Sequence, residues 1–132
     1  MIHIKYKLDK SSMHGIGIFA DQDIPKGELI YTTSPLLDVN ITQAQFDSLN
    51  EEEERVARYY GYWDNAHKVW HVDFADIHFI NHSFTPNTTQ DLSRPEAPLV
   101  ATRDIKAGEE LTQNYLDFES EDVLRKRGFD LQ

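Results

Sequence analysis

Residues 2–8 alternate between apolar and polar side chains, which is the pattern of a strand with one buried face. Ile2, Ile4, Tyr6 and Leu8 fall on one side, and the residues between them, two lysines and a histidine, fall on the other. Because successive side chains of a strand point to opposite faces, this alternation predicts a half-buried strand over residues 2–8.

Short apolar segments separated by turn residues continue along the chain and predict a β-rich α+β domain with few helices. Thr42 and Gln45 have the spacing of a capping box, so they predict the start of a helical region that runs to about Tyr59 with a break near Asn50. Acidic residues begin, and basic residues end, a predicted terminal helix over 119–128. The other expected strands and hairpins occupy residues 28–32, 36–41, 62–74, 99–102 and 111–116.

One nine-residue pattern occurs twice in the chain. Residues 20–28 read A-x-x-D-I-x-x-G-E, and residues 101–109 repeat the same pattern. Each copy places turn residues between apolar segments, so each predicts a strand, a tight turn and a second strand. Two copies are too few for a solenoid, and we expect two similar hairpins that frame one β-rich domain.

Length and composition predict one domain over residues 1–132, because the chain is long enough for one core and too short for two. The absence of cysteine excludes disulfides and thiolate metal sites. No apolar run is long enough to cross a membrane, and the N-terminal residues do not resemble a signal peptide. We therefore expect a soluble intracellular protein, cytoplasmic if bacterial, and nuclear or cytoplasmic if eukaryotic or viral. The oligomeric state stays open.

The formal net charge of −10 argues against direct binding to nucleic acid, which requires clustered lysine and arginine. The same charge suits a basic partner, since an acidic rim would steer a lysine-rich peptide to a site. The alternative is that the charge mainly provides solubility.

The stretch over residues 78–88 carries polar groups where a folding segment would carry apolar ones. Asn81, His82, Ser83 and Asn87 offer amide, imidazole and hydroxyl groups, and Pro86 stiffens the turn that presents them. This pattern favours a binding or catalytic site. A polar loop that only satisfies its own backbone would have the same composition.

Three motifs of the chain resemble those of the SET domain lysine methyltransferases. Residues 78–87, H-F-I-N-H-S-F-T-P-N, are similar to the signature R-F-I-N-H-S-C-x-P-N, with His78 in place of Arg and Phe84 in place of Cys. Residues 15–20, G-I-G-I-F-A, resemble the first motif of the family. Residues 108–115, G-E-E-L-T-Q-N-Y, resemble its last motif, G-E-E-L-x-x-D-Y.

The resemblance covers nearly the whole chain and implies a minimal, stand-alone SET domain without cysteine-rich flanking segments. The implied core runs from about residue 4 to 117, and residues 118–132 form a flanking C-terminal helix. The implied fold is mostly β, with small sheets, hairpins and short helices. Its C-terminal strand packs beside the Asn-His-Ser loop in a pseudoknot-like arrangement.

The resemblance also implies a site for the cofactor S-adenosyl-L-methionine. Glycines suit a loop that approaches a ligand closely because they lack a Cβ, and an amide complements the donor and acceptor edge of adenine. A neutral imidazole at position 78 would hold a carboxylate less strongly than the guanidinium that is usual there. The residues implied to bind the cofactor are Gly15, Ile16, Gly17, His78, Asn81, His82 and Phe129.

Tyr115 is the implied catalytic residue, and its hydroxyl would orient the attacking amine. The implied enzyme is a protein-lysine N-methyltransferase that transfers methyl to the ε-amine of a histone or another basic protein. Gln113 replaces an aromatic residue that is often found in the family and leaves the number of methyl groups added open. Phe118 and Phe129 are candidates to pack at the C-terminal end of the site.

Other interpretations stay open at this point. The departures at His78, Gln113 and Asn114 favour a catalytically weak SET-like module that binds peptide or cofactor without transfer. A ligand-free β-rich domain and an enzyme acting on small amines are further alternatives. The fingerprint G-x-G-x-x-A formally matches a dinucleotide site, but a turn and a strand follow it where that site requires a helix.

Four histidines also invite interpretation as a metal site. His67, His71, His78 and His82 contain two H-x-x-x-H spacings. That spacing brings two imidazoles to one face only on a helix, and His71 lies on an expected strand. The sequence therefore predicts no metal site.

Overall fold

The computed structural model describes residues 1–129, which form two compact units. The first unit combines residues 1–34 with 75–114. The second combines residues 35–74 with the described chain from Tyr115 onward. Most regular structure is strand, and the helices are short, as predicted.

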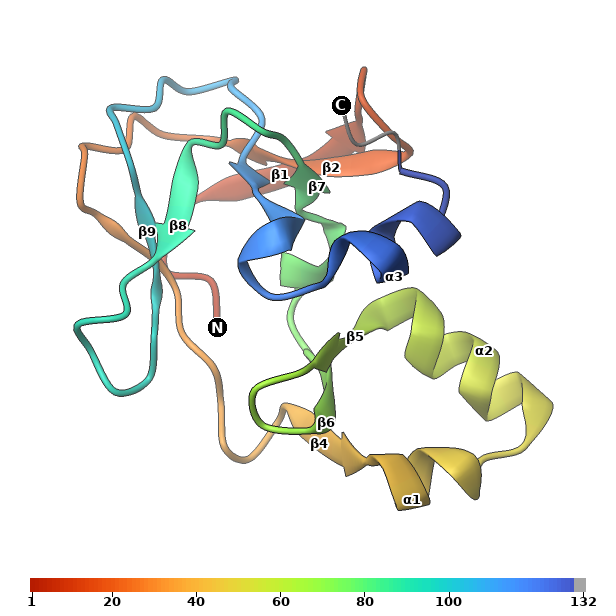
Figure 1. Ribbon diagram of the computed structural model, residues 1–132. Coiled ribbons are helices and arrows are strands. Elements are labelled where there is room, and N and C mark those ends of the chain that lie inside the picture. The colour runs from red at the N-terminus through yellow and green to blue at the C-terminus, as the bar shows by residue number, and fades with distance from the viewer. Residues whose placement is uncertain (130–132) are drawn as a thin grey trace. The chain divides into compact units, whose positions relative to one another are not determined.

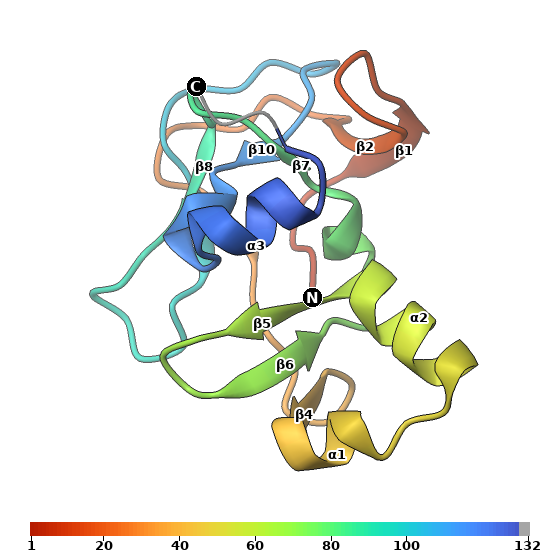
Figure 2. The ribbon, with the colours of Figure 1, turned by 45° about the vertical axis from the view of Figure 1, so that its right-hand side comes forward.

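The first unit is built from three small sheets (Figure 1). Two antiparallel strands form one sheet, β1-β2, and three form another in the order β3-β9-β8, while β7 and β10 pair in parallel. Figure 2 shows β7 and β10 next to each other. The elements are β1 (Tyr6–Lys10), β2 (Ile16–Ala20), β3 (Leu29–Tyr31), the 3-10 helix η1 (Asp76–Phe79), β7 (Asn81–His82), β8 (Thr88–Gln90), β9 (Leu99–Ala101) and β10 (Thr112–Gln113).

Aliphatic side chains form the core of this unit. Ile18, Ile30 and Leu111 have no exposed surface, and Ile77 and Ile80 of the η1 region join them. Fully burying each of these side chains contributes about 1.5–3 kcal/mol. This core fixes the strands on which the polar stretch and the glycine loop are carried.

The two copies of the repeated pattern pair with each other, so the prediction of two separate hairpins was wrong. β2 and β3 pair with β1 and β9, not with one another. Ile24 forms an antiparallel bridge to Ile105, and both side chains are buried. The carboxylate of each copy's aspartate accepts a backbone N–H from the other copy's turn. The predicted turn at the glycine of each copy is confirmed, since both glycines have positive φ. Local sequence does not specify which segment a strand pairs with.

Two strand boundaries also differ from the prediction. The first strand runs over Tyr6–Lys10 and not over residues 2–8, because its partner β2 ends opposite Tyr6. Ile2 instead forms a bridge to Tyr31. The strand expected over 111–116 is reduced to Thr112–Gln113, and Tyr115 begins a 3-10 helix.

The second unit joins an antiparallel sheet, in the order β4-β6-β5, to helices. The helix start predicted at Thr42 is confirmed, since Thr42 caps a helix in a complete capping box. At the predicted break, Asn50 caps a second helix in the same way. The predicted hairpin around Asp64 is confirmed as β5-β6. The elements are β4 (Val39–Thr42), α1 (Gln43–Asp47), α2 (Glu51–Tyr60), β5 (Gly61–Asp64), β6 (Val69–Val72), the 3-10 helix η2 (Tyr115–Asp117) and α3 (Glu121–Lys126).

Among residues 1–129, no helix has both the length and the apolar character needed to span a membrane.

Candidate active site

The parallel pairing of β7 with β10 brings the polar stretch beside the last motif. Asn81 lies opposite Thr112, and His82 lies opposite Gln113. The backbone N–H of Ser83 donates to the carbonyl of Gln113 at 3.0 Å. This pairing is the packing of a C-terminal strand beside the Asn-His-Ser loop that the sequence resemblance implied.

Asn87 holds the segment before β10 in place. Its Oδ1 accepts the backbone N–H of Thr112 at 2.8 Å, and its Nδ2 donates to the carbonyl of Glu110 at 2.8 Å. The hydroxyl of Thr88 donates to the carbonyl of Thr112 at 2.8 Å. Asn87 and Thr88 are almost completely buried, so their side chains form the hydrogen bonds that water would otherwise form with these backbone groups.

The carboxylate of Glu110 connects the last motif to Ser11 and to the polar stretch. It accepts the hydroxyl of Ser11 at 2.7 Å and Nδ2 of Asn81 at 2.9 Å. Nδ2 of Asn81 also donates to the carbonyl of His14 at 3.0 Å. Asn81 therefore bonds the backbone at the glycine loop, and its direct contact with a cofactor stays a prediction.

The two glycines of the loop have different reasons to be glycine. A Cβ at Gly17 would lie 2.6 Å from Oε2 of Glu110, so a side chain here would require the carboxylate of Glu110 to move. Gly15 has φ +49, in the left-handed region, and a Cβ there would meet nothing within 4 Å. Ile16 between them is about half exposed. The loop thus leaves open space over Gly15, which fits a ligand that approaches its backbone.

The two histidines predicted at this site lie in the same unit. His78 is on η1 with its ring 4.3 Å from that of Phe79, and His82 is on β7 with its ring edge-to-face with Phe84 at 4.5 Å. The first unit therefore contains six of the predicted residues, namely Gly15, Ile16, Gly17, His78, Asn81 and His82.

The other two predicted residues, Tyr115 and Phe129, lie together in the second unit. Their rings are 5.5 Å apart in an edge-to-face arrangement, and Phe118 lies 5.6 Å from Tyr115. The guanidinium of Arg127 lies over both rings, 5.9 Å from the centre of Tyr115 and 5.7 Å from that of Phe129. Tyr115 begins η2, so the predicted catalytic tyrosine is on a 3-10 turn and not on a strand.

An ion pair with a buried carboxylate and a partly exposed guanidinium supports this aromatic cluster. Nη1 of Arg127 is 2.8 Å from both carboxylate oxygens of Glu119, whose side chain is only 2% exposed. Burial raises the pKa of Glu119, and Arg127 opposes that shift. Burial likewise raises the pKa of Tyr62, whose ring packs 4.6 Å from Phe118, so this phenol stays neutral at physiological pH.

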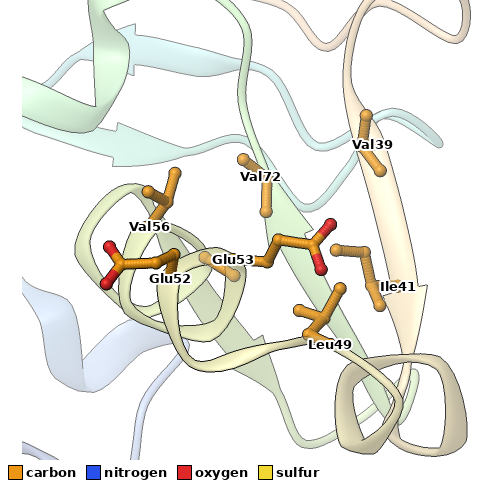
Figure 3. Close-up of a pocket in the computed structure, with 8 residues that line it drawn as sticks. Val39, Ile41, Leu49, Glu52, Glu53, Val56 and Val72 are labelled. Atoms are coloured by element: carbon orange, nitrogen blue, oxygen red, sulfur yellow. The ribbon is translucent and has the colours of Figure 1, made fainter.

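A cavity of about 410 Å³ opens elsewhere in the second unit, between α2 and the strands β4 and β6 (Figure 3). Its lining contains none of the residues predicted to bind cofactor or substrate. The lining residues are Val39, Ile41, Leu49, Glu52, Glu53, Val56, Ala57 and Val72.

Sequence reasoning missed the roles of Ser11 and Glu110. Glu110 was visible as part of the last motif, but no signal in the sequence paired it with Ser11, which is 99 residues away. A polar residue shortly before a Gly-x-Gly loop was the one available hint.

Together, the fold and site define a small β-rich domain in which a parallel strand pair holds a glycine loop. A model of the SET domain family matches residues 15–116. The variant-silencing SET domain-containing protein of Plasmodium falciparum (isolate 3D7) is 30% identical over 118 residues, which are 83% of this chain and 5% of that protein. The chain belongs to the SET domain family.

Solved structures agree with this assignment. The crystal structure of a candidate histone methyltransferase from Plasmodium falciparum matches with a TM-score of 0.61 at 22% identity, over 86% of this chain and 95% of that one. Chaetomium thermophilum Polycomb Repressive Complex 2, in an autoinhibited conformation bound to S-adenosylmethionine, matches with a TM-score of 0.65 at 25% identity. That match covers 95% of this chain and 17% of the other.

Proposed function

We propose that this SET domain is a protein-lysine N-methyltransferase that uses S-adenosyl-L-methionine and acts on a histone or another basic protein. One observation carries the proposal. Nδ2 of Asn81 donates to the carboxylate of Glu110 at 2.9 Å and to the carbonyl of Ile16 in the glycine loop at 3.4 Å, with open space over Gly15. This arrangement prepares a rigid backbone edge for a ligand before the ligand arrives.

When bound, S-adenosylmethionine supplies a methyl group on a positively charged sulfur. The roles we assign to the chain are binding and orientation. We assign backbone contacts with the cofactor to Gly15, Ile16 and Gly17, and further contacts to His78 and His82, which belong to the same unit. Phe129 offers an aromatic face on which adenine can stack.

Tyr115 is proposed to position the lysine amine. Only the neutral amine attacks, and deprotonating a lysine at neutral pH costs roughly 4 kcal/mol, from a reference pKa about three units higher. An apolar surrounding that excludes water lowers that cost because it disfavours the ammonium form. The phenol ring of Tyr115 lies among aromatic rings, which suits this role. Its reference pKa near ~10 makes it a poor general base.

The acidic character of the chain supports a basic substrate. The formal net charge is −10, and four consecutive glutamates, Glu51–Glu54, begin α2. A field of this sign accelerates the encounter with a lysine-rich segment and does so less at high salt.

The test is transfer of a labelled methyl group to a panel of histones, basic ribosomal proteins and cell lysate. We expect label on lysine with the wild type and loss of most turnover in Tyr115→Phe, with folding and cofactor binding retained. Tyr59→Phe, a change of an exposed tyrosine on α2, is the matched control and should keep full activity. Wild-type turnover in Tyr115→Phe would remove this residue from the mechanism.

The departures from the family motifs support a second candidate, a module that binds without transferring. Gln113 and Asn114 stand where the family usually has an aromatic residue and an aspartate, and Gln113 is buried in β10. Cofactor binding without label on any substrate would favour this module. Absence of cofactor binding would refute the cofactor assignment for both candidates.

A further inference from the structure

A second cluster of polar side chains lies on the β5-β6 hairpin, and the proposed function does not use it. Asp64 ends β5, His67 lies in the turn, and His71 lies on β6. Oδ2 of Asp64 is 2.7 Å from Nδ1 of His67 and 2.9 Å from Nε2 of His71. These atoms all lie within 4.8 Å of one another, so two imidazoles and a carboxylate converge on one point.

The turn fixes the carboxylate in this orientation. Oδ1 of Asp64 accepts the backbone N–H of Ala66 at 2.9 Å and that of His67 at 3.1 Å. One oxygen thus closes the turn, and the other is left for the two imidazoles. The side chain of Asp64 is only 18% exposed, which limits its freedom to turn toward water.

His71 is oriented from the opposite side by β4. Its Nδ1 lies 2.5 Å from Oδ1 of Asn40, within hydrogen-bond distance. The other ring nitrogen, Nε2, faces Asp64 at 2.9 Å. Histidines that bind metals commonly donate their second nitrogen to an oxygen in this way.

We propose that Asp64, His67 and His71 bind a divalent transition-metal ion of the Zn²⁺ type. Two imidazole nitrogens and one carboxylate oxygen are ligands that Zn²⁺ accepts, and water would complete a tetrahedral set. Such an ion joins the end of β5, the turn and β6. His67 is 78% exposed and leaves an open path for the ion.

The H-x-x-x-H spacing brings two imidazoles to one face on a helix, and for this reason the sequence predicted no metal site. In the structure, the β5-β6 hairpin brings the two imidazoles together instead. Asp64 pairs with Val69 across the ladder, which places His71 and the turn residue His67 on the same carboxylate.

The experiment is a titration of the whole chain with Zn²⁺ alone, in competition with a chromophoric chelator. The wild type should bind one ion and melt at a higher temperature in its presence. His67→Gln and His71→Gln should each weaken affinity by at least about tenfold, and Asn40→Ala by about 10–100-fold, the usual effect of removing an orienting partner.

His3→Gln is the control, since this histidine contacts Thr32 in the other unit and should leave affinity unchanged. Because His67 is exposed, its substitution should not affect folding, and circular dichroism checks this directly. Co²⁺ gives a second readout, since its visible absorption reports nitrogen ligands and four-coordination. Failure to bind Zn²⁺ at millimolar concentration, or unchanged affinity in either ligand variant, would refute the metal site. The cluster would then only stabilise the hairpin through hydrogen bonds.

Discussion

The carboxylate of Glu110 makes a stability prediction that follows directly from its contacts. Glu110→Ala removes the acceptor of the Ser11 hydroxyl and of the Asn81 amide, two donors on residues that are at most 7% exposed. Hydrogen bonds to charged groups contribute about 1.5–3 kcal/mol each, and the lower value suits a half-buried carboxylate. The two bonds together predict a loss of about 3 kcal/mol in the free energy of unfolding.

The substitution should also loosen the glycine loop. The hydroxyl of Ser11 accepts the backbone N–H of Met13 at 3.0 Å and of His14 at 3.3 Å, and Glu110 fixes the orientation of that hydroxyl. Hydrogen exchange at these two amides should therefore become faster in Glu110→Ala by more than global destabilisation explains. Glu110→Gln should have an intermediate effect, because its amide can satisfy one donor but presents N–H groups to the other.

Equilibrium urea unfolding measures the first effect, and hydrogen exchange followed by NMR measures the second. The matched control is Glu109→Ala, the neighbouring glutamate, whose contacts with Lys106 and Arg103 are exposed and contribute little. If Glu110→Ala destabilises the protein no more than Glu109→Ala does, the carboxylate does not hold the loop, and the reasoning is refuted.

Three further predictions concern buried groups and the aromatic cluster. Asn87→Ala leaves one backbone N–H and one carbonyl of the last motif without partners, and should cost about 3 kcal/mol in urea unfolding, whereas an effect below about 1 kcal/mol would mean that water replaces the amide. Burial raises the pKa of Glu119, so the stability that its neutral form provides is complete below the unfolded pKa and is lost as pH rises through the folded pKa. The free energy of unfolding of Glu119→Gln, measured relative to that of the wild type, should therefore be higher at pH 7 than at pH 4. If this difference is instead lower at pH 7, the ion pair with Arg127 outweighs the effect of burial. Phe129→Ala should weaken S-adenosylmethionine binding several-fold by calorimetry, and unchanged affinity would exclude stacking on this ring.

The sequence by itself determined the local features of this protein. The capping box at Thr42 specified a helix start because a cap depends on residues three positions apart. The motifs around residues 15–20, 78–87 and 108–115 specified the family. The turn at Asp64 was readable for the same reason, since its hydrogen bonds reach only two or three residues along the chain.

Only the tertiary structure decided which distant segments meet. The two copies of the repeat pair with each other, and Glu110 reaches Asn81 and Ser11 across 29 and 99 residues. Strand pairing and buried hydrogen bonds of this kind depend on how the core packs, and residue type alone does not encode their partners. The carboxylate-imidazole cluster of the β5-β6 hairpin has the same origin, because the ladder register and not the sequence spacing brings its side chains together.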